Sequence, residues 1–334
     1  MPNIALAPLL RTDFELHYIG RPDSIEEELL ATHCPYITFH PLKCVKLARK
    51  FTLKNLAVPF GLLASNSRAK KLLTELQPAA IFSKGGFAAL PVMLAAGKIP
   101  LILHESDYTM GLANRMAAKK CKVICTSFAD LAMNVKRGIC TGAPLRPSVY
   151  LGDKLLAEKE SGLTGRENLL IMGGSLGARA INEAVYRNIH ELCRRFNVVH
   201  ITGKNNPTPV SHPNYFHLPF TNRIEDYLAW ANFCLTRGGA NALFELAALA
   251  IPSLVVPLPK AASRGDQIDN ARYFERMGCV TVLPQSELEN LPSALDGLKE
   301  KRQALSSACK SIKNLDGTKI IADLIKKTAY SRTP

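Results

Sequence analysis

The chain of 334 residues lacks the features that mark several classes of protein. Its longest apolar stretch, residues 88–97, is about half the length of a membrane-spanning helix. The first residues show neither the basic nor the apolar region of a secretory signal. The nine cysteines form no C-x-x-C pair, so we expect reduced thiols rather than a disulfide or zinc framework. With 47% hydrophobic residues, the chain is expected to be a soluble cytoplasmic protein of two domains.

Acidic residues are missing from residues 29–74, where eight lysines and arginines contribute to a net charge of +14. The same segment holds an apolar run at 56–63. Apolar residues among lysines favour contact with an anionic membrane surface, where each lysine contributes roughly 1 kcal/mol. A solvated helix face is the alternative interpretation. Because no RNA-recognition motif or zinc finger is present, we expect no nucleic-acid partner.

Short apolar runs alternate with helical patterns along the chain, which indicates an α/β fold with parallel sheets covered on both faces. The pattern breaks at residues 142–153, where two prolines and two glycines mark the expected domain boundary. Two glycine turns, which begin at Lys84 and Arg237, each follow a predicted strand and are each expected to open a helix. This near-repeat favours two Rossmann-like halves. The predicted strands are 15–19, 80–82, 101–104, 123–126, 169–172, 198–201, 233–235, 253–257 and 280–283, and the predicted helices include 24–31, 88–96, 178–189, 241–250 and 267–277.

A glycine turn after the predicted strand 169–172 is the first candidate ligand site. Gly173, Gly174 and Gly177 allow a ligand to approach the backbone closely, and the amides at the start of the next helix favour phosphate. Ser175 adds a hydroxyl. The turn departs from the G-x-G-x-x-G spacing, and no acidic residue ends the next strand, which disfavours a dinucleotide. Plain packing of strand on helix is the alternative interpretation.

Polar side chains after later strands extend this candidate site. Glu245 lies about one turn into a predicted helix, where it could accept hydrogen bonds from ribose hydroxyls or simply favour the helix dipole. Asp266, Gln267 and Asn270 lie on or beside one turn of the next helix and form a cluster that suits a sugar. Because no D-x-D motif occurs, we expect no metal of the kind used by many sugar-nucleotide enzymes, and no cofactor.

A strand end in the first half carries the candidate catalytic groups. His104, Glu105 and Asp107 lie there together, and ligands approach open α/β sheets at the carboxyl ends of their strands. A structural role for these three residues is the alternative interpretation.

Five segments, in this order, resemble glycosyltransferase family 28, and within it the MurG family, whose members add N-acetylglucosamine to lipid I. The resemblance covers nearly the whole chain. The segments are His104-Glu-Ser-Asp-Tyr-Thr-Met-Gly-Leu-Ala-Asn, Thr141-Gly-Ala-Pro-Leu-Arg, Gly173-Gly-Ser-Leu-Gly-Ala-Arg, Arg237-Gly-Gly-Ala-Asn-Ala-Leu-Phe-Glu and Ser263-Arg-Gly-Asp-Gln-Ile-Asp-Asn-Ala.

The resemblance implies a GT-B fold, in which two doubly wound, Rossmann-like domains face a cleft. Residues 1–146, joined by a C-terminal helix at about 318–334, would bind the acceptor and the membrane, and residues 147–317 would bind the UDP-sugar. The implied reaction is an inverting transfer from UDP-N-acetylglucosamine to lipid I that forms lipid II. The implied location is the cytoplasmic face of the cell membrane, as a peripheral protein, with other cell-wall and division enzymes as further partners.

The resemblance also assigns roles to residues of this chain. Ser175 and the turn of Gly173, Gly174 and Gly177 would face the UDP diphosphate. Gln267 would bind the donor sugar. The remaining assignments are helix N-terminal amides for Ala240, Asn241 and Ala242, a ribose contact for Glu245, closure on the nucleotide for Arg146, and membrane contact for the segment around Phe60.

The start of the chain departs from the family pattern. Family members open with a strand, a G-G-T-x-G-H loop and a histidine often proposed as the general base, whereas this chain begins at the following helix. Because the first strand of a doubly wound sheet is central, its loss would split the sheet, and we expect a misplaced start codon or a truncated sequence. Under genuine loss, Glu105 or Asp107 is a weak candidate for the base, which stays unknown. The alternative functions are transfer to another lipid acceptor, such as diacylglycerol, and a catalytically silent membrane scaffold that binds a UDP-sugar.

Overall fold

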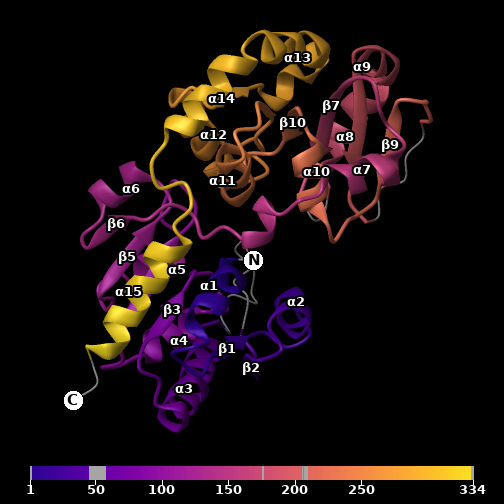
Figure 1. The fold of residues 1–334 in the computed structure, drawn as a ribbon. Coiled ribbons are helices and arrows are strands. Elements are labelled where there is room, and N and C mark those ends of the chain that lie inside the picture. The colour runs from indigo at the N-terminus through magenta and orange to yellow at the C-terminus, as the bar shows by residue number, and fades with distance from the viewer. Residues whose placement is uncertain (1, 45–57, 175–176, 205, 207–209, 332–334) are drawn as a thin grey trace. The chain divides into compact units, whose positions relative to one another are not determined.

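The computed structural model describes residues 2–44, 58–174, 177–204, 206 and 210–331. The chain divides into two compact units. Unit 1 comprises Met1–Arg146 and Asp316–Pro334, and unit 2 comprises Pro147–Leu315. Each unit consists of parallel strands with helices packed around them (Figure 1). The α/β class predicted from the apolar pattern is therefore confirmed.

The described residues of unit 1 form two parallel sheets, with strand orders β1-β2 and β3-β4-β5-β6. Strands β1 and β3 together line a cavity of 510 Å³. The elements are α1 (Pro2–Leu10), β1 (His17–Gly20), α2 (Ile25–His33), β2 (Thr38–Pro41), α3 (Val58–Leu76), β3 (Ile81–Ser83), α4 (Leu90–Ala95), β4 (Leu101–Glu105), α5 (Leu112–Ala117), β5 (Val123–Thr126), α6 (Ala129–Asn134), β6 (Gly138–Cys140) and α15 (Thr318–Tyr330).

Strand β4 is apolar along its length because both of its faces are covered. Leu101 and Leu103 pack into a core shared with α3, α4 and α5. Ile102 points to the opposite face, where it packs with Leu6 of α1 and Ile321 of α15. The strand therefore needs large apolar residues at successive positions, which is the pattern that predicted it.

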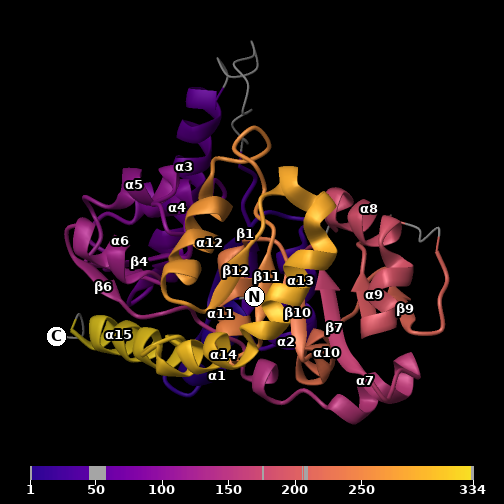
Figure 2. The same ribbon diagram turned by 90° about the horizontal axis from the view of Figure 1, so that it is seen from above.

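The C-terminal helix α15 belongs to unit 1, where it lies next to α1 (Figures 1 and 2). Thr318, its first residue, fixes the start of the helix to the segment after β6. The Thr318 hydroxyl donates a hydrogen bond to the Leu145 carbonyl at 3.0 Å and accepts one from the Leu145 amide at 2.9 Å. A parallel bridge between Ala143 and Asp316 adds a backbone contact.

In unit 2 the strands that the structure describes form one parallel sheet, with the strand order β12-β11-β10-β7-β8-β9. Its elements are the 3₁₀ helix η2 (Pro147–Tyr150), α7 (Lys154–Ser161), β7 (Glu167–Met172), α8 (Arg179–Arg187), α9 (Ile189–Arg195), β8 (Phe196–Ile201), β9 (Tyr215–Leu218), α10 (Ile224–Trp230), β10 (Phe233–Thr236), α11 (Ala240–Ala248), β11 (Ser253–Val255), α12 (Asp266–Arg276), β12 (Val280–Val282), the 3₁₀ helix η3 (Gln285–Asn290), α13 (Leu291–Glu300) and α14 (Arg302–Ser311).

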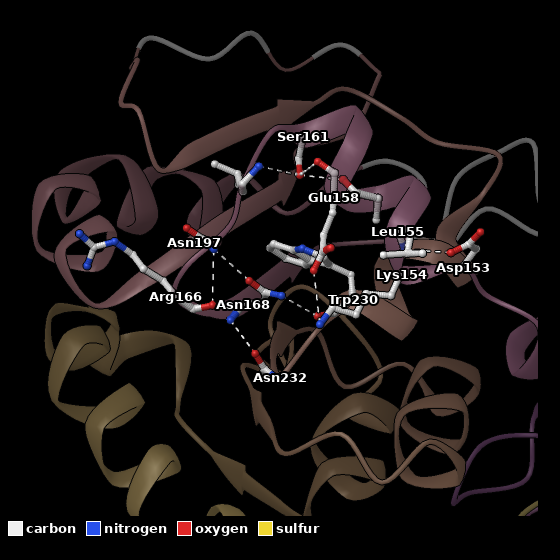
Figure 3. A network of polar contacts seen from close by, with 12 residues as sticks. Asp153, Lys154, Leu155, Glu158, Ser161, Arg166, Asn168, Asn197, Trp230 and Asn232 are labelled. Atoms are coloured by element: carbon white, nitrogen blue, oxygen red, sulfur yellow. Dashed lines mark hydrogen bonds and ion pairs between the residues drawn. The ribbon is translucent and has the colours of Figure 1, made fainter.

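A buried asparagine network ties the strands of unit 2 together at their amino ends (Figure 3). The Asn168 side chain donates to the Trp230 carbonyl at 3.0 Å, and the Asn168 amide donates to the Asn232 side chain at 2.9 Å. Asn197, the partner of Asn168 in the β7–β8 register, donates to the Asn168 side chain at 3.1 Å. The network lies at the end of β7 opposite the glycine turn, so it holds the sheet in register without occupying the edge where ligands bind.

The single helix predicted for residues 178–189 is wrong. Helix α8 ends at Arg187 and α9 begins at Ile189. Asn188 lies between them with φ −109° and ψ 11°, and its side chain donates to the Ala184 carbonyl at 2.9 Å. This local hydrogen bond competes with the helical backbone pattern and breaks the helix.

Candidate functional site

The carboxyl edge of the unit 2 sheet brings two glycine turns next to each other. Strands β7 and β10 are neighbours, with Met172 opposite Thr236 at their ends. Parallel strands share one carboxyl edge, so the turn after β7 and the turn after β10 emerge side by side. Ligands bind at this edge in open α/β sheets.

The turn after β7 requires glycine at position 177. Gly177 has φ +76°, and a Cβ placed there would lie 1.9 Å from the Thr202 carbonyl oxygen. Gly174 also has a positive φ, but open space surrounds the position that its Cβ would occupy. A Cβ at Gly174 would thus meet no neighbour, and the approach of a ligand to this backbone stays a prediction. Helix α8 follows, and its N-cap residue, Ala178, makes no side-chain cap hydrogen bond to the first amides. Ser175 lies outside the described residues, and its contact with a diphosphate stays a prediction.

The turn after β10 packs closely against α12. A Cβ on Gly238 would lie 2.4 Å from the Gln267 carbonyl oxygen, so glycine is required for this approach. Helix α11 begins at Ala240 with no side-chain cap, which leaves the amides of Ala240, Asn241 and Ala242 without a capping side chain.

A cavity of 380 Å³ joins the two turns and the start of α12. Its lining brings together Gly173, Gly177 and Gln267, three residues that were predicted to share one site. The Gln267 side-chain oxygen accepts a hydrogen bond from the Leu258 amide at 3.1 Å, which holds the side chain in place. The described residues thus form a pocket at the sheet edge with charged and amide side chains in its lining, of the size that binds small ligands.

Arg237 also lines this cavity, although its side chain was not predicted as a site residue. It is 8% exposed and donates to the Val256 carbonyl at 3.1 Å and to the Gln285 side chain at 2.8 Å. Burial lowers the pKa of this guanidinium from its ordinary value, but an arginine stays charged in proteins. The site therefore holds a fixed positive charge. The signal that could have found it is its position, directly after a buried strand and before a glycine turn.

Three other polar residues of unit 2 that were predicted for this site, Glu245, Asp266 and Asn270, are not in the described lining of this cavity. Glu245 lies half-buried in the second turn of α11, with a partner of its own. Asn270 is fully buried and donates to the Gly238 carbonyl at 3.2 Å, while Asp266 pairs with Arg264 at 2.7 Å. Asn270 has no exposed surface, so the prediction that it joins Gln267 in a sugar-binding cluster is wrong, whereas the same role for Asp266 stays a prediction.

Arg146 is the last residue of unit 1 before the chain enters unit 2. Its side chain is half-buried and has an interaction within the structure. Closure of Arg146 on the nucleotide stays a prediction.

At the carboxyl edge of unit 1, the carboxylate of Glu105 is held by its own loop. It accepts hydrogen bonds from the Gly111 amide and the Asn114 side chain, each at 2.9 Å, and from the Asp107 amide at 3.3 Å. Burial is the largest effect on this carboxyl group and raises its pKa. With its oxygens engaged in this way, Glu105 shapes the loop after β4. Its role as a base, like that of Asp107, stays a prediction.

Lys84 directly follows β3. Its side chain was not predicted from the sequence as a site residue. Its ammonium nitrogen lies 2.8 Å from His104 Nδ1 and also hydrogen-bonds the Ser106 hydroxyl. Burial lowers the pKa of Lys84 from 10.5 to about 7, against the opposing charges of Glu105 and Asp107. Burial and the neighbouring Lys84 also lower the pKa of the fully buried His104 well below its ordinary value. The edge thus holds a lysine that titrates near neutral pH.

The turn at Lys84 leads into a helix, as predicted, but this helix begins two residues later than the expected start at residue 88. Gly85 and Gly86 have φ values of +77° and +83°, which are incompatible with a right-handed helix, and α4 begins only at Leu90.

The basic segment of unit 1 is described only in part. Lys46, Arg49, Lys50 and Lys54 lie outside the described residues, as does the side chain of Phe60. On α3, Leu63 is 65% exposed, and Arg68 and the two lysines that follow it at 70–71 are also exposed. Among the described residues, no helix combines the length and the hydropathy needed to cross a bilayer. In the same residues, no cluster of three or more metal-ligating side chains occurs.

Comparisons with known proteins cover nearly the whole chain. Residues 1–126 match the glycosyltransferase family 28 N-terminal domain, and residues 168–326 match the glycosyltransferase family 28 C-terminal domain. A protein of Clostridium tetani named UDP-N-acetylglucosamine--N-acetylmuramyl-(pentapeptide) pyrophosphoryl-undecaprenol N-acetylglucosamine transferase is 38% identical, over 98% of this chain and 94% of that protein. A protein of the same name from Clostridium botulinum (strain Kyoto / Type A2) is 39% identical, over 98% of this chain and 95% of that protein.

A solved structure, the crystal structure of Acinetobacter baumannii MurG, is similar to this chain with a TM-score of 0.75. It is 24% identical and the match covers 98% of this chain and 95% of that one. This similarity shows a shared fold.

Proposed function

The chain belongs to glycosyltransferase family 28, and from this premise we propose that it transfers N-acetylglucosamine from UDP-N-acetylglucosamine to lipid I in peptidoglycan synthesis. The observation that carries the proposal is the identity of 38% to 39%, over 98% of the chain, with proteins named for this transfer. Lipid I is undecaprenyl-pyrophosphoryl-N-acetylmuramyl-pentapeptide, the acceptor that the names of these relatives contain.

The cavity of unit 2 suits the donor. Its glycine turn lets a diphosphate approach the backbone, and Arg237 supplies a buried positive charge. As UDP leaves, negative charge grows on the diphosphate, and fixed amides and a guanidinium stabilise that charge without rearranging. Gln267, held by the Leu258 amide, keeps side-chain donors for the hydroxyls of the sugar.

Unit 1 is proposed to bind the acceptor and the membrane. Helix α3 exposes Leu63 and, further along the same helix, the basic residues Arg68, Lys70 and Lys71, a combination that suits an anionic lipid surface. The acceptor carries an undecaprenyl chain, so the enzyme must work at a membrane. We propose a peripheral association through this face.

The proposal is tested by transfer of labelled N-acetylglucosamine from UDP to a lipid I analogue, with diacylglycerol as the competing acceptor. We expect lipid I to be glycosylated and diacylglycerol to be left unmodified. Preference for diacylglycerol would contradict the acceptor assignment. Binding of UDP-N-acetylglucosamine without transfer to either lipid would instead support a silent scaffold.

A further inference from the structure

Lys84 lies at the carboxyl edge of the β3-β4-β5-β6 sheet and lines a cavity of unit 1. It directly follows β3, and the volume of the cavity is 510 Å³. The same cavity is lined by Ser83, Gly85 and Gly86, so the lysine lies at a glycine turn that a ligand can approach. Substrate hydroxyls are bound at such edges in α/β folds.

The hydrogen bonds around Lys84 define which proton it holds. His104 Nε2 lies 3.3 Å from the Gly142 carbonyl oxygen, an atom that can only accept, so Nε2 carries the proton. The other ring nitrogen, Nδ1, is therefore an acceptor and takes a hydrogen bond from Lys84 Nζ at 2.8 Å. With one N–H directed to His104 and the Ser106 hydroxyl on a second side, the amine keeps one position for a further partner.

The titratable groups around the amine come from three neighbouring segments. Glu105 at the end of β4 and Asp107 in the following loop raise the pKa of Lys84, but burial opposes them and is the larger effect. Cys125 of β5 also faces the amine, and because burial raises the pKa of this thiol to about 12, it is uncharged at neutral pH. The neutral ring of His104 adds no positive charge that would assist deprotonation. The net result is a pKa of about 7, so both protonation states of Lys84 are populated at neutral pH.

We propose that Lys84 is the proton acceptor for the attacking acceptor hydroxyl, with His104 and Ser106 as positioning residues. This inference rests on the proposed glycosyl transfer. In the step, the hydroxyl oxygen forms a bond to C1 of N-acetylglucosamine, and the bond from C1 to the diphosphate oxygen breaks. UDP leaves with the electron pair, and the hydroxyl proton moves to the lone pair of Lys84 Nζ. The ammonium then releases this proton to water.

Glu105 fits the role less well than Lys84. Its carboxylate accepts hydrogen bonds from two backbone amides and from Asn114, and these stabilise the ionised form within its loop. A proton transferred to Glu105 would break those contacts, whereas a proton on Lys84 leaves its hydrogen bond to His104 in place.

The test compares Lys84→Gln and Lys84→Arg in the transfer assay across pH 5.5–9. Arginine keeps the positive charge but cannot accept a proton at these pH values. We expect the wild-type kcat to rise with pH through about 7. In both variants, kcat should fall by roughly 10²–10⁴-fold and should no longer rise with pH in this range. The KM for UDP-N-acetylglucosamine should be unchanged. Lys98→Gln, at an exposed lysine of the same unit, is the matched control and should retain wild-type kinetics.

An arginine variant with more than a tenth of the wild-type kcat would overturn the inference, since charge alone would then suffice. Such a result would leave the proposed function intact. Absence of transfer by the wild type to any lipid acceptor would overturn the proposed function, and this inference with it. Competitive acetylation of the folded chain gives a readout independent of activity. We expect Lys84 to be modified with a midpoint near pH 7; a midpoint above pH 9 would also overturn the inference.

Discussion

Replacing Lys84 by methionine is expected to change how the stability of unit 1 depends on pH. In the folded chain, burial holds the pKa of Lys84 at about 7, against an ordinary value of 10.5. Between these two pH values the unfolded chain binds a proton that the folded chain does not, so wild-type stability rises with pH. One pKa unit corresponds to about 1.4 kcal/mol, so this lysine costs at most about 4 kcal/mol of stability at pH 7 and under ~1 kcal/mol at pH 10.

Methionine removes this titration and keeps an unbranched stem of similar length. It also leaves His104 Nδ1 without its donor, which costs about 1–3 kcal/mol at every pH. The variant should therefore be more stable than the wild type at pH 7 and less stable at pH 10. The two curves should cross at roughly pH 9.

Urea denaturation from pH 7 to pH 10 measures this difference. Trp230, the single tryptophan of the chain, lies in unit 2, so its fluorescence follows that unit. Far-UV circular dichroism follows both units. A transition that is seen in circular dichroism but not in tryptophan fluorescence therefore reports the unfolding of unit 1. Lys98→Met is the control and should run parallel to the wild type. If the free energy of unfolding of the wild type and of Lys84→Met changed with pH in parallel, Lys84 would not be neutral in the folded state.

Four further outcomes are expected. Arg237→Gln should weaken UDP-N-acetylglucosamine binding by roughly 10- to 100-fold in calorimetry, because a charged hydrogen-bond donor is lost, and unchanged binding would exclude this cavity as the diphosphate site. Gln267→Ala should weaken UDP-N-acetylglucosamine binding by about 2- to 10-fold but leave UDP binding unchanged; an equal loss of both would show that the sugar assignment is wrong. Thr318→Val should destabilise unit 1 by about 1–3 kcal/mol in urea denaturation, since two buried hydrogen bonds to Leu145 are lost, and an unchanged midpoint would contradict this anchoring role for α15. The double change Arg68→Glu and Lys70→Glu should weaken sedimentation with anionic vesicles by at least about 30-fold, and equal binding would return α3 to a solvated face.

Most of the strands that the sequence predicted are buried on both faces, although the predicted β1, β3 and β12 lie at sheet edges. In β4 and β7, successive side chains enter two different cores, so the apolar run is continuous and visible in the sequence. Strands β2, β6 and β9 were not predicted. Each lies at an edge of its sheet and carries partly exposed residues, such as His40 in β2 and Ile139 in β6. An edge strand is defined by its backbone pairing, which leaves a weak trace in side-chain composition.

The candidate site was predictable where the backbone itself forms it. Gly173 and Gly177 were found because a tight turn and a close approach demand glycine at those positions. Asn270 was assigned wrongly because its partner, the Gly238 carbonyl, lies 32 residues away in the sequence. Lys84 was missed for the same reason, since His104 and Ser106, about 20 residues later, give it its properties. Spacing in a sequence reports local geometry, and tertiary packing decides which polar side chains stay available.

The two glycine turns that begin with a basic residue illustrate how packing separates similar sequences. Lys84 and Arg237 each follow a strand at the carboxyl edge of the sheet in their unit, and each precedes two glycines. Burial lowers the pKa of both, but only the lysine reaches the range where it loses its proton. A guanidinium that stays charged suits the growing charge of a leaving diphosphate, and an amine near neutrality suits the removal of a proton from a hydroxyl. The exchange Lys84→Arg would give unit 1 the permanent charge found in unit 2, so it separates these two roles more sharply than removal of either side chain.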